Sequence, residues 1–154
     1  MKKVLVMAVA VMLISGAAYA GDFAVQGGWL AGTGLGGGIK MGIVEVSVGI
    51  PWYGGFPIGG GVVFDVYSFN IDKIKTNVYV GGDFTYFLGA IVPIWTVIGK
   101  GGLEFCITDQ MSVFGGGGFG VLSTPGITIA GFGTFGGGII PTGAGEVGVR
   151  YYMN

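Results

Sequence analysis

The chain has 154 residues, of which 36 are glycine, 51% are hydrophobic and 10% are charged, against about 25% charged residues in an average soluble domain. Its mean hydropathy is +0.77 and its formal charge is −1 at pH 7. This composition excludes a basic surface for nucleic acid. A single cysteine, Cys106, excludes an intramolecular disulfide framework. Interior glycines each cost a helix about 1 kcal/mol relative to alanine, which disfavours a helical membrane protein.

The first 20 residues have the pattern of a cleaved export signal. A short basic start precedes an unbroken apolar stretch at residues 4–14, and a small-x-small sequence ends at Ala20. The apolar stretch is shorter than the roughly 20 residues that a spanning helix needs. We therefore predict a signal peptide over residues 1–20 and one mature domain over residues 21–154. Without the signal, five basic residues stand against eight acidic ones, a formal charge of −3.

Alternation with a period of two runs along the mature chain, as expected of strands with two different faces. In residues 23–29 and 77–86, the polar side chains fall on one face. In residues 146–153, both Glu146 and Arg150 lie on the face opposite the valines. In a bilayer, a closed barrel satisfies every backbone group between its strands. The sequence therefore predicts an all-β fold, an antiparallel transmembrane β-barrel.

Turns are predicted from polar clusters, from prolines and from changes of phase. The apolar positions switch from odd to even numbers near Gly42, which indicates a turn there. The short polar segments 70–75 and 108–110 predict tight turns at the same end of the barrel. Prolines in segments 51–57, 90–93 and 123–126 are unsuited to central strands. We expect these segments to be longer loops at the opposite end.

Single-chain bacterial barrels have an even number of strands and tight turns on the periplasmic side. Together with the turns, this rule predicts eight strands with both termini in the periplasm. The strands are expected near residues 22–31, 34–43, 44–53, 58–69, 76–88, 95–107, 111–121 and 144–153. Residues 122–143 then form a long, glycine-rich outer loop. Because residues 127–132 could form a strand, a barrel of ten strands is the alternative.

Four aromatic residues are predicted to mark the outer boundary of the membrane. They are Trp29, Trp52, Tyr53 and Trp95, all at the outer end in this arrangement. Indole and phenol rings favour the interface, where the polar group stays hydrated and the ring is buried.

The alternation also predicts which charged residues face the interior of the barrel. They are Lys40, Glu45, Asp65, Asp83, Lys100, Glu104, Glu146 and Arg150. An eight-stranded barrel is only wide enough for side chains to fill it, and buried charges require partners. We expect these residues to pair and to plug the barrel. An ion or proton pathway along the same residues is the alternative, because interior glycines such as Gly116 could leave a narrow channel.

The signal, residues 105–113 and residues 145–152 resemble small OmpA/OmpX-type outer-membrane barrels, and the resemblance extends loosely over the mature chain. It implies a bacterial outer-membrane location, with outer-membrane lipid and the barrel-assembly machinery as partners. Barrels of this family usually end on an aromatic residue, whereas this chain ends on Asn154.

The sequence predicts no catalytic residue, no metal ligand and no cofactor. It has no histidine, which excludes Ser-His and Asp-His mechanisms. Its glycine runs lack the lysine of a phosphate-binding loop. We therefore expect a non-enzymatic structural or interaction barrel, whose apolar segments 51–57 and 87–98 contact a protein or lipid. A small, porin-like pore for small or apolar solutes is the alternative. A secreted, self-assembling glycine-rich β-protein is a further alternative, and a glycine-zipper helical protein is the least favoured alternative.

Overall fold

The computed structural model of the protein describes residues 23–51, 55–90, 93–129, 133–135 and 137–153. The predicted signal peptide, residues 1–20, lies outside this part of the chain, as do Trp52 and Tyr53. Every regular element in the described part is a strand. A helix long and apolar enough to cross a membrane is absent from it.

Ten strands are present in the described residues. They are β1 (Phe23–Leu30), β2 (Gly34–Met41), β3 (Val44–Gly49), β4 (Phe56–Ile71), β5 (Ile74–Leu88), β6 (Trp95–Cys106), β7 (Met111–Thr124), β8 (Ile127–Ile129), β9 (Gly133–Phe135) and β10 (Gly138–Met153). Eight of them close into an antiparallel barrel in the order β1-β10-β7-β6-β5-β4-β3-β2, and β8 pairs only with β9. The predicted all-β barrel of eight strands is confirmed, and the alternative of ten barrel strands is wrong.

The tight turns lie where the sequence predicts them. Gly42 and Ile43 connect β2 to β3, and Asp72 and Lys73 connect β4 to β5. Gly42 and Asp72 have φ angles of 56° and 54°, the left-handed conformation that two-residue hairpin turns require. In the β6–β7 turn, the backbone amide of Met111 donates to Thr108 Oγ1 at 2.9 Å. Each tight turn therefore has a local chemical cause.

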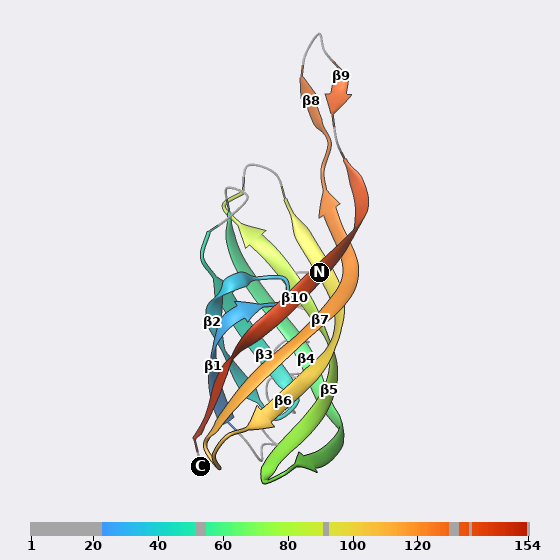
Figure 1. The fold of residues 1–154 in the computed structure, drawn as a ribbon. Coiled ribbons are helices and arrows are strands. Elements are labelled where there is room, and N and C mark those ends of the chain that lie inside the picture. The colour runs from blue at the N-terminus through green and yellow to red at the C-terminus, as the bar shows by residue number, and fades with distance from the viewer. Residues whose placement is uncertain (1–22, 52–54, 91–92, 130–132, 136, 154) are drawn as a thin grey trace.

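The wall of the barrel is not equally high on all sides. Strands β1, β2 and β3 have eight, eight and six residues, whereas β7 and β10 have 14 and 16. The β1–β10 ladder ends at Trp29 and Val147, but β10 continues to pair with β7 back to Gly138. Figure 1 shows β7 and β10 rising above the shorter strands, with β8 and β9 at the top. The prediction of a long loop over residues 122–143 is wrong.

Two prolines lie inside strands, contrary to the expectation that they mark loops. Pro57 pairs with Phe87 of β5, but β3 ends its pairing with β4 at Ile58. Pro141 pairs with Val121 of β7 in the part of β10 that β1 does not reach. A proline is tolerated where one edge of its strand has no neighbour, because its missing N–H then breaks no ladder bond.

Outward-facing side chains are apolar around the barrel. In β10, Val147, Val149, Tyr151 and Met153 are 45–58% exposed, whereas Glu146 and Arg150 are buried. Outward-facing residues of other strands follow the same pattern, among them Val25, Leu35, Ile58, Val62, Val80, Phe84, Val97, Leu103 and Val113. The predicted alternation is confirmed, and it gives the barrel an apolar outside and a polar inside.

A register shift between Asp65 and Tyr67 changes the phase of β4. Before it, Val63 points inward and is buried. After it, the inward position is Ser68, whose hydroxyl donates to Asn77 Oδ1 at 2.8 Å. A β-bulge of this kind inserts one unpaired residue and strengthens the local twist. Asp65, immediately before the shift, is exposed at the end of the barrel that carries the tight turns.

Candidate functional site

Six charged side chains meet inside the barrel, and we call them the interior charge cluster. They are Glu45 on β3, Asp83 on β5, Lys100 and Glu104 on β6, and Glu146 and Arg150 on β10. All six side chains point into the barrel because each residue occupies an inward position in the period-two alternation of its strand. Barrel closure then brings together residues far apart in sequence.

Lys100 is the cation at one side of the cluster. Its Nζ lies 2.9 Å from Glu45 Oε2, 3.0 Å from Asp83 Oδ2 and 3.1 Å from Glu146 Oε2. The side chain of Lys100 is only 3% exposed. An ammonium group has three N–H donors, and here each one has a carboxylate within reach. Lys100 thus joins three strands through one charged atom.

Arg150 is the second cation, and its side chain is fully buried. One terminal nitrogen lies 2.5 Å from Glu45 Oε1 and the other 2.9 Å from Glu104 Oε2, while Nε donates to Gln26 Oε1 at 2.8 Å. The guanidinium carbon also lies 4.4 Å from the centre of the Phe114 ring, a favourable cation–π geometry. Because Glu45 binds both Arg150 and Lys100, the two halves of the cluster form one network.

Neutral hydroxyl groups complete the coordination of the buried carboxylates. Tyr79 donates to Glu146 Oε1 at 2.6 Å, and Tyr152 donates to Glu104 Oε1 at 2.7 Å. Ser112 donates to the same oxygen of Glu104. Desolvated charges are tolerated only when they are paired and their remaining lone pairs are bonded. The structure therefore shows an eight-stranded barrel with buried, paired charges across its interior.

Two of the predicted interior charges stand apart from the cluster. Lys40 is buried but forms no ion pair with an acidic residue that the structure describes, and Asp65 is exposed. Both line a cavity of about 400 Å³ at the tight-turn end, together with Lys73 and Lys75. The expectation that Asp65 belongs to a buried paired network is wrong, because Asp65 lies at the open mouth of the barrel, where its side chain is exposed and lines this cavity.

The sequence analysis did not identify the polar neutral members of the network. Gln26, Tyr79, Ser112 and Tyr152 each bond a charged group of the cluster. Selecting residues by charge alone overlooks them. The signal was nevertheless available, because each occupies an inward position of the same alternation that identifies Arg150.

The structure describes two of the four aromatic residues predicted at the membrane boundary, Trp29 and Trp95. Trp29 is 49% exposed near the end of β1, and Trp95 opens β6 and stacks on Phe84 with ring centroids 6.3 Å apart. Both strands have these ends opposite the tight turns. The apolar segment 87–98 is only in part the expected loop, since its ends belong to β5 and β6; Phe87, Ile94 and Ile98 are buried, whereas Leu88 and Val97 are 47% and 45% exposed.

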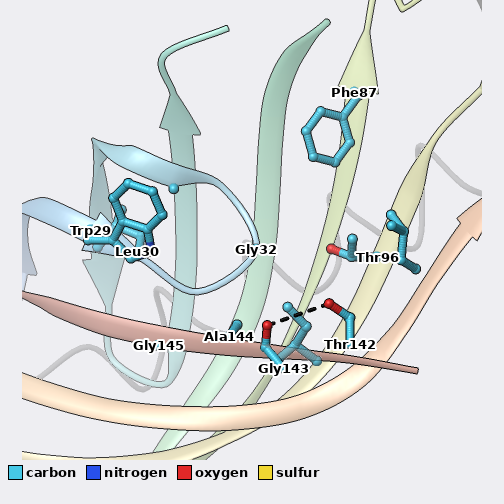
Figure 2. A pocket seen from close by; sticks show the side chains of 12 residues that line it. Trp29, Leu30, Gly32, Phe87, Thr96, Thr142, Gly143, Ala144 and Gly145 are labelled. Atoms are coloured by element: carbon cyan, nitrogen blue, oxygen red, sulfur yellow. Dashed lines mark hydrogen bonds between the residues drawn. The ribbon is translucent and has the colours of Figure 1, made fainter. Parts of the chain in front are cut away.

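A second cavity, of about 240 Å³, lies at the end opposite the tight turns. Figure 2 shows Trp29 and Leu30 on one side of it, Phe87 and Thr96 on the other, and the β10 residues 142–145 along its edge. Among the described residues, the hydroxyl oxygens of Thr85 and Thr96 are buried without a hydrogen-bond partner. None of the described residues that line this cavity is charged, which distinguishes it from the interior charge cluster.

Glycines of β6 and β7 make room for the aromatic side chain of Tyr79. A Cβ atom at Gly102 or Gly116 would lie 2.5 or 2.6 Å from the Tyr79 hydroxyl oxygen. On the neighbouring strand β10, a Cβ atom at Gly148, the cross-strand partner of Phe114, would lie 2.7 Å from the Phe114 ring. The glycine runs therefore allow large inward side chains to lie flat across neighbouring strands, which fills the narrow lumen.

We expect Gly116→Ala to lower the free energy of unfolding by about 1–3 kcal/mol, the usual cost of overpacking. The added methyl group would displace the Tyr79 hydroxyl from Glu146 and press against the backbone of Gly101. The measurement is urea unfolding of the detergent-solubilised barrel. Gly115→Ala is the matched control, because a Cβ atom there meets only the Glu146 backbone oxygen, at 3.8 Å. Equal stability of the two variants would contradict the packing role of Gly116.

The described residues contain no group of three or more His, Cys, Asp or Glu side chains that could hold a metal ion. Comparison with family models, with curated proteins and with solved structures found no match. The fold and the charge cluster therefore define the class by themselves: a closed, eight-stranded antiparallel barrel with a buried ion-paired interior. At the level of the fold, this agrees with the resemblance to small OmpA/OmpX-type barrels.

Proposed function

We propose that the mature chain is a structural or interaction barrel of the bacterial outer membrane, inserted there by the barrel-assembly machinery, without enzymatic activity and with its interior closed to solutes. The observation that supports this most strongly is the inverted distribution of side chains. Apolar residues cover the outside of the barrel, whereas the charged residues of β3, β5, β6 and β10 are buried within it.

Lipid is the solvent that suits such an outer surface. A water-soluble monomer rarely exposes contiguous apolar patches larger than a few hundred Å². Here outward-facing Val, Leu, Ile and Phe side chains are found on every strand of the barrel. A closed ladder also leaves few free backbone groups along the wall, as the hydrocarbon requires. The export signal predicted at residues 1–20 is consistent with this location.

The closed interior follows from the charge cluster. Lys100 on β6 and Arg150 on β10 bind carboxylates contributed by two other strands, β3 and β5, and by β6 and β10 themselves. The Tyr79 and Phe114 rings fill the space beside them. The interior of an eight-stranded barrel is only wide enough to be filled by its own side chains. These contacts favour a plug over a porin-like pore.

The tall side of the barrel offers a surface for a partner. Phe119, Ile139 and Ile140 on β7 and β10 are exposed, Phe119 by 86%. Part of this region lies beyond the reach of the shorter strands. We favour this surface over the apolar segments 51–57 and 87–98, in which Pro57, Phe87 and Ile98 are buried.

Gel mobility of the membrane fraction, with and without boiling in detergent, tests the proposal. We expect the unboiled chain to migrate as a compact species and to shift on boiling, because a closed barrel resists unfolding by detergent until it is heated. In planar bilayers we expect no steady current. A soluble or fibrous chain without a mobility shift would contradict the membrane barrel, and a steady current would favour the pore.

A further inference from the structure

The barrel wall has a notch at the end opposite the tight turns. The ladder between β1 and β10 ends at Trp29 and Val147, and residues 138–146 of β10 pair with β7 alone. Along this stretch one edge of β10 has no neighbouring strand. The β1–β2 turn at residues 31–33 forms the opposite side of the notch.

The 240 Å³ cavity is located at this notch. It is lined by Leu30 of β1, Ile98 of β6, Leu122 of β7 and Ala144 of β10, among others. Each of these strands turns an apolar side chain toward the space, and none of the described residues that line it is charged. A water molecule occupies about 30 Å³ of liquid, so the cavity has room for about eight atoms of that size. This is the size of a short alkyl chain.

One polar group in the lining lacks a partner. Thr96 is 7% exposed, lines the cavity, and its Oγ1 atom forms no hydrogen bond with the described residues. The Oγ1 atom of its cross-strand neighbour Thr85 is also buried and forms no hydrogen bond with the described residues. Buried hydroxyl groups are nearly always bonded, and an exception calls for an unplaced partner. In Figure 2, Thr96 lies across the cavity from Leu30.

Strand lengths place the base of the notch at the outer rim of the membrane. The eight residues of β1 span about 27 Å along the strand, and a tilt of about 40° reduces this to about 20 Å across the bilayer. The apolar band of such barrels is about 25 Å tall. The outer end of β1 therefore lies about 5 Å below the outer boundary. The base of the notch borders lipid, whereas most of the unpaired edge of β10 extends above the hydrocarbon, where its backbone groups reach water. This step rests on the proposed function.

We propose that the cavity binds a neutral single-chain amphiphile, a short alkyl chain that carries one hydroxyl or carbonyl group, which enters from the membrane through the notch. The chain packs against Leu30, Ile98 and Leu122, and its polar group bonds with Thr96. A carboxylate or an ammonium group is disfavoured, because the described lining offers no charge to pair with it. Heptanol, with a single polar group, has the matching size.

Quenching of Trp29 by bromoheptanol tests this site, because Trp29 lines the cavity. The barrel carries Trp52→Phe and Trp95→Phe and is held in lipid nanodiscs. We expect saturable quenching. Ala144→Phe should weaken binding at least tenfold by filling the cavity, whereas Val149→Phe, on the outward face of the same strand, should leave it unchanged.

Thr96→Val separates the polar contact from simple partitioning. We expect it to weaken bromoheptanol binding by about two- to tenfold, the usual value of one hydrogen bond, and to leave bromoheptane unaffected. Linear, non-saturable quenching in all variants would overturn the site, and an unchanged affinity in Thr96→Val would overturn the assigned contact and with it the proposal. Each variant is first tested for the heat-dependent mobility shift, so that failure of the membrane barrel itself is recognised before ligand is added.

Discussion

Replacing Arg150 by methionine is expected to lower the free energy of unfolding by about 3–5 kcal/mol, the cost of removing one partner from a buried ion pair. The guanidinium group binds Glu45, Glu104 and Gln26. Methionine would leave two buried carboxylates without their nearest cation at this side of the cluster. Urea unfolding of the detergent-solubilised barrel, followed by tryptophan fluorescence and by gel mobility, measures the change.

Two further variants separate this effect from lost packing. Adding Glu104→Gln to Arg150→Met removes one of the orphaned charges, so we expect the double variant to recover part of the lost stability. Lys73→Ala, at an exposed turn position, should change stability by no more than about 0.5 kcal/mol. If Arg150→Met unfolds at the same urea concentration as the parent, the charge cluster does not stabilise the barrel.

Lys100→Met is expected to open the interior to cations and to lower stability by a similar amount, about 3–5 kcal/mol. The Nζ atom is the shared partner of Glu45, Asp83 and Glu146. Without it, three carboxylates face one another, and they repel unless water and cations enter between them. Rings of carboxylates select cations in channels. Planar-bilayer recordings should show discrete, cation-selective current steps in the variant and none in the parent.

Lys100→Arg is the matched control, because it retains the charge, and we expect it to remain closed. A closed Lys100→Met barrel would show that the aromatic rings of Tyr79 and Phe114, rather than the ion pairs, obstruct the lumen. Currents through the parent protein would contradict the plug altogether. The two cations are also expected to be coupled, since both bind Glu45, so the effects of Arg150→Met and Lys100→Met should not add.

Much of the barrel was predictable from the sequence because its signals are local. The change of phase near Gly42 predicts the β2–β3 turn, and the polar segment at Asp72 predicts the β4–β5 turn. Alternation in β10 correctly separates Arg150 from the outward valines. These features depend only on the two faces of a strand and on the conformations that a turn allows. Together with the rule that such barrels have an even number of strands, they predict eight barrel strands, with ten as the alternative that the closed structure excludes.

Pairing within the interior could not be predicted in the same way. Glu45 and Arg150 are 105 positions apart in sequence, and their contact depends on how the strands are staggered when the barrel closes. The bulge after Asp65 has no clear signal in the alternation of β4, and the exposure of Asp65 follows from its place at the mouth of the closed barrel. Selection by charge also omits Gln26 and Tyr79, which complete the network.

By itself, the sequence determined the strand class, the tight turns and the face to which each charged residue of the cluster belongs, and it narrowed the number of barrel strands to eight or ten. Only the tertiary structure decided which charges pair, how far β7 and β10 rise above β1, and that Pro57 and Pro141 are tolerated in strands. The physical reason is the range of the interactions. Alternation and turn geometry act over a few neighbouring residues, whereas ion pairs, cavities and wall height arise when strands distant in sequence are brought together.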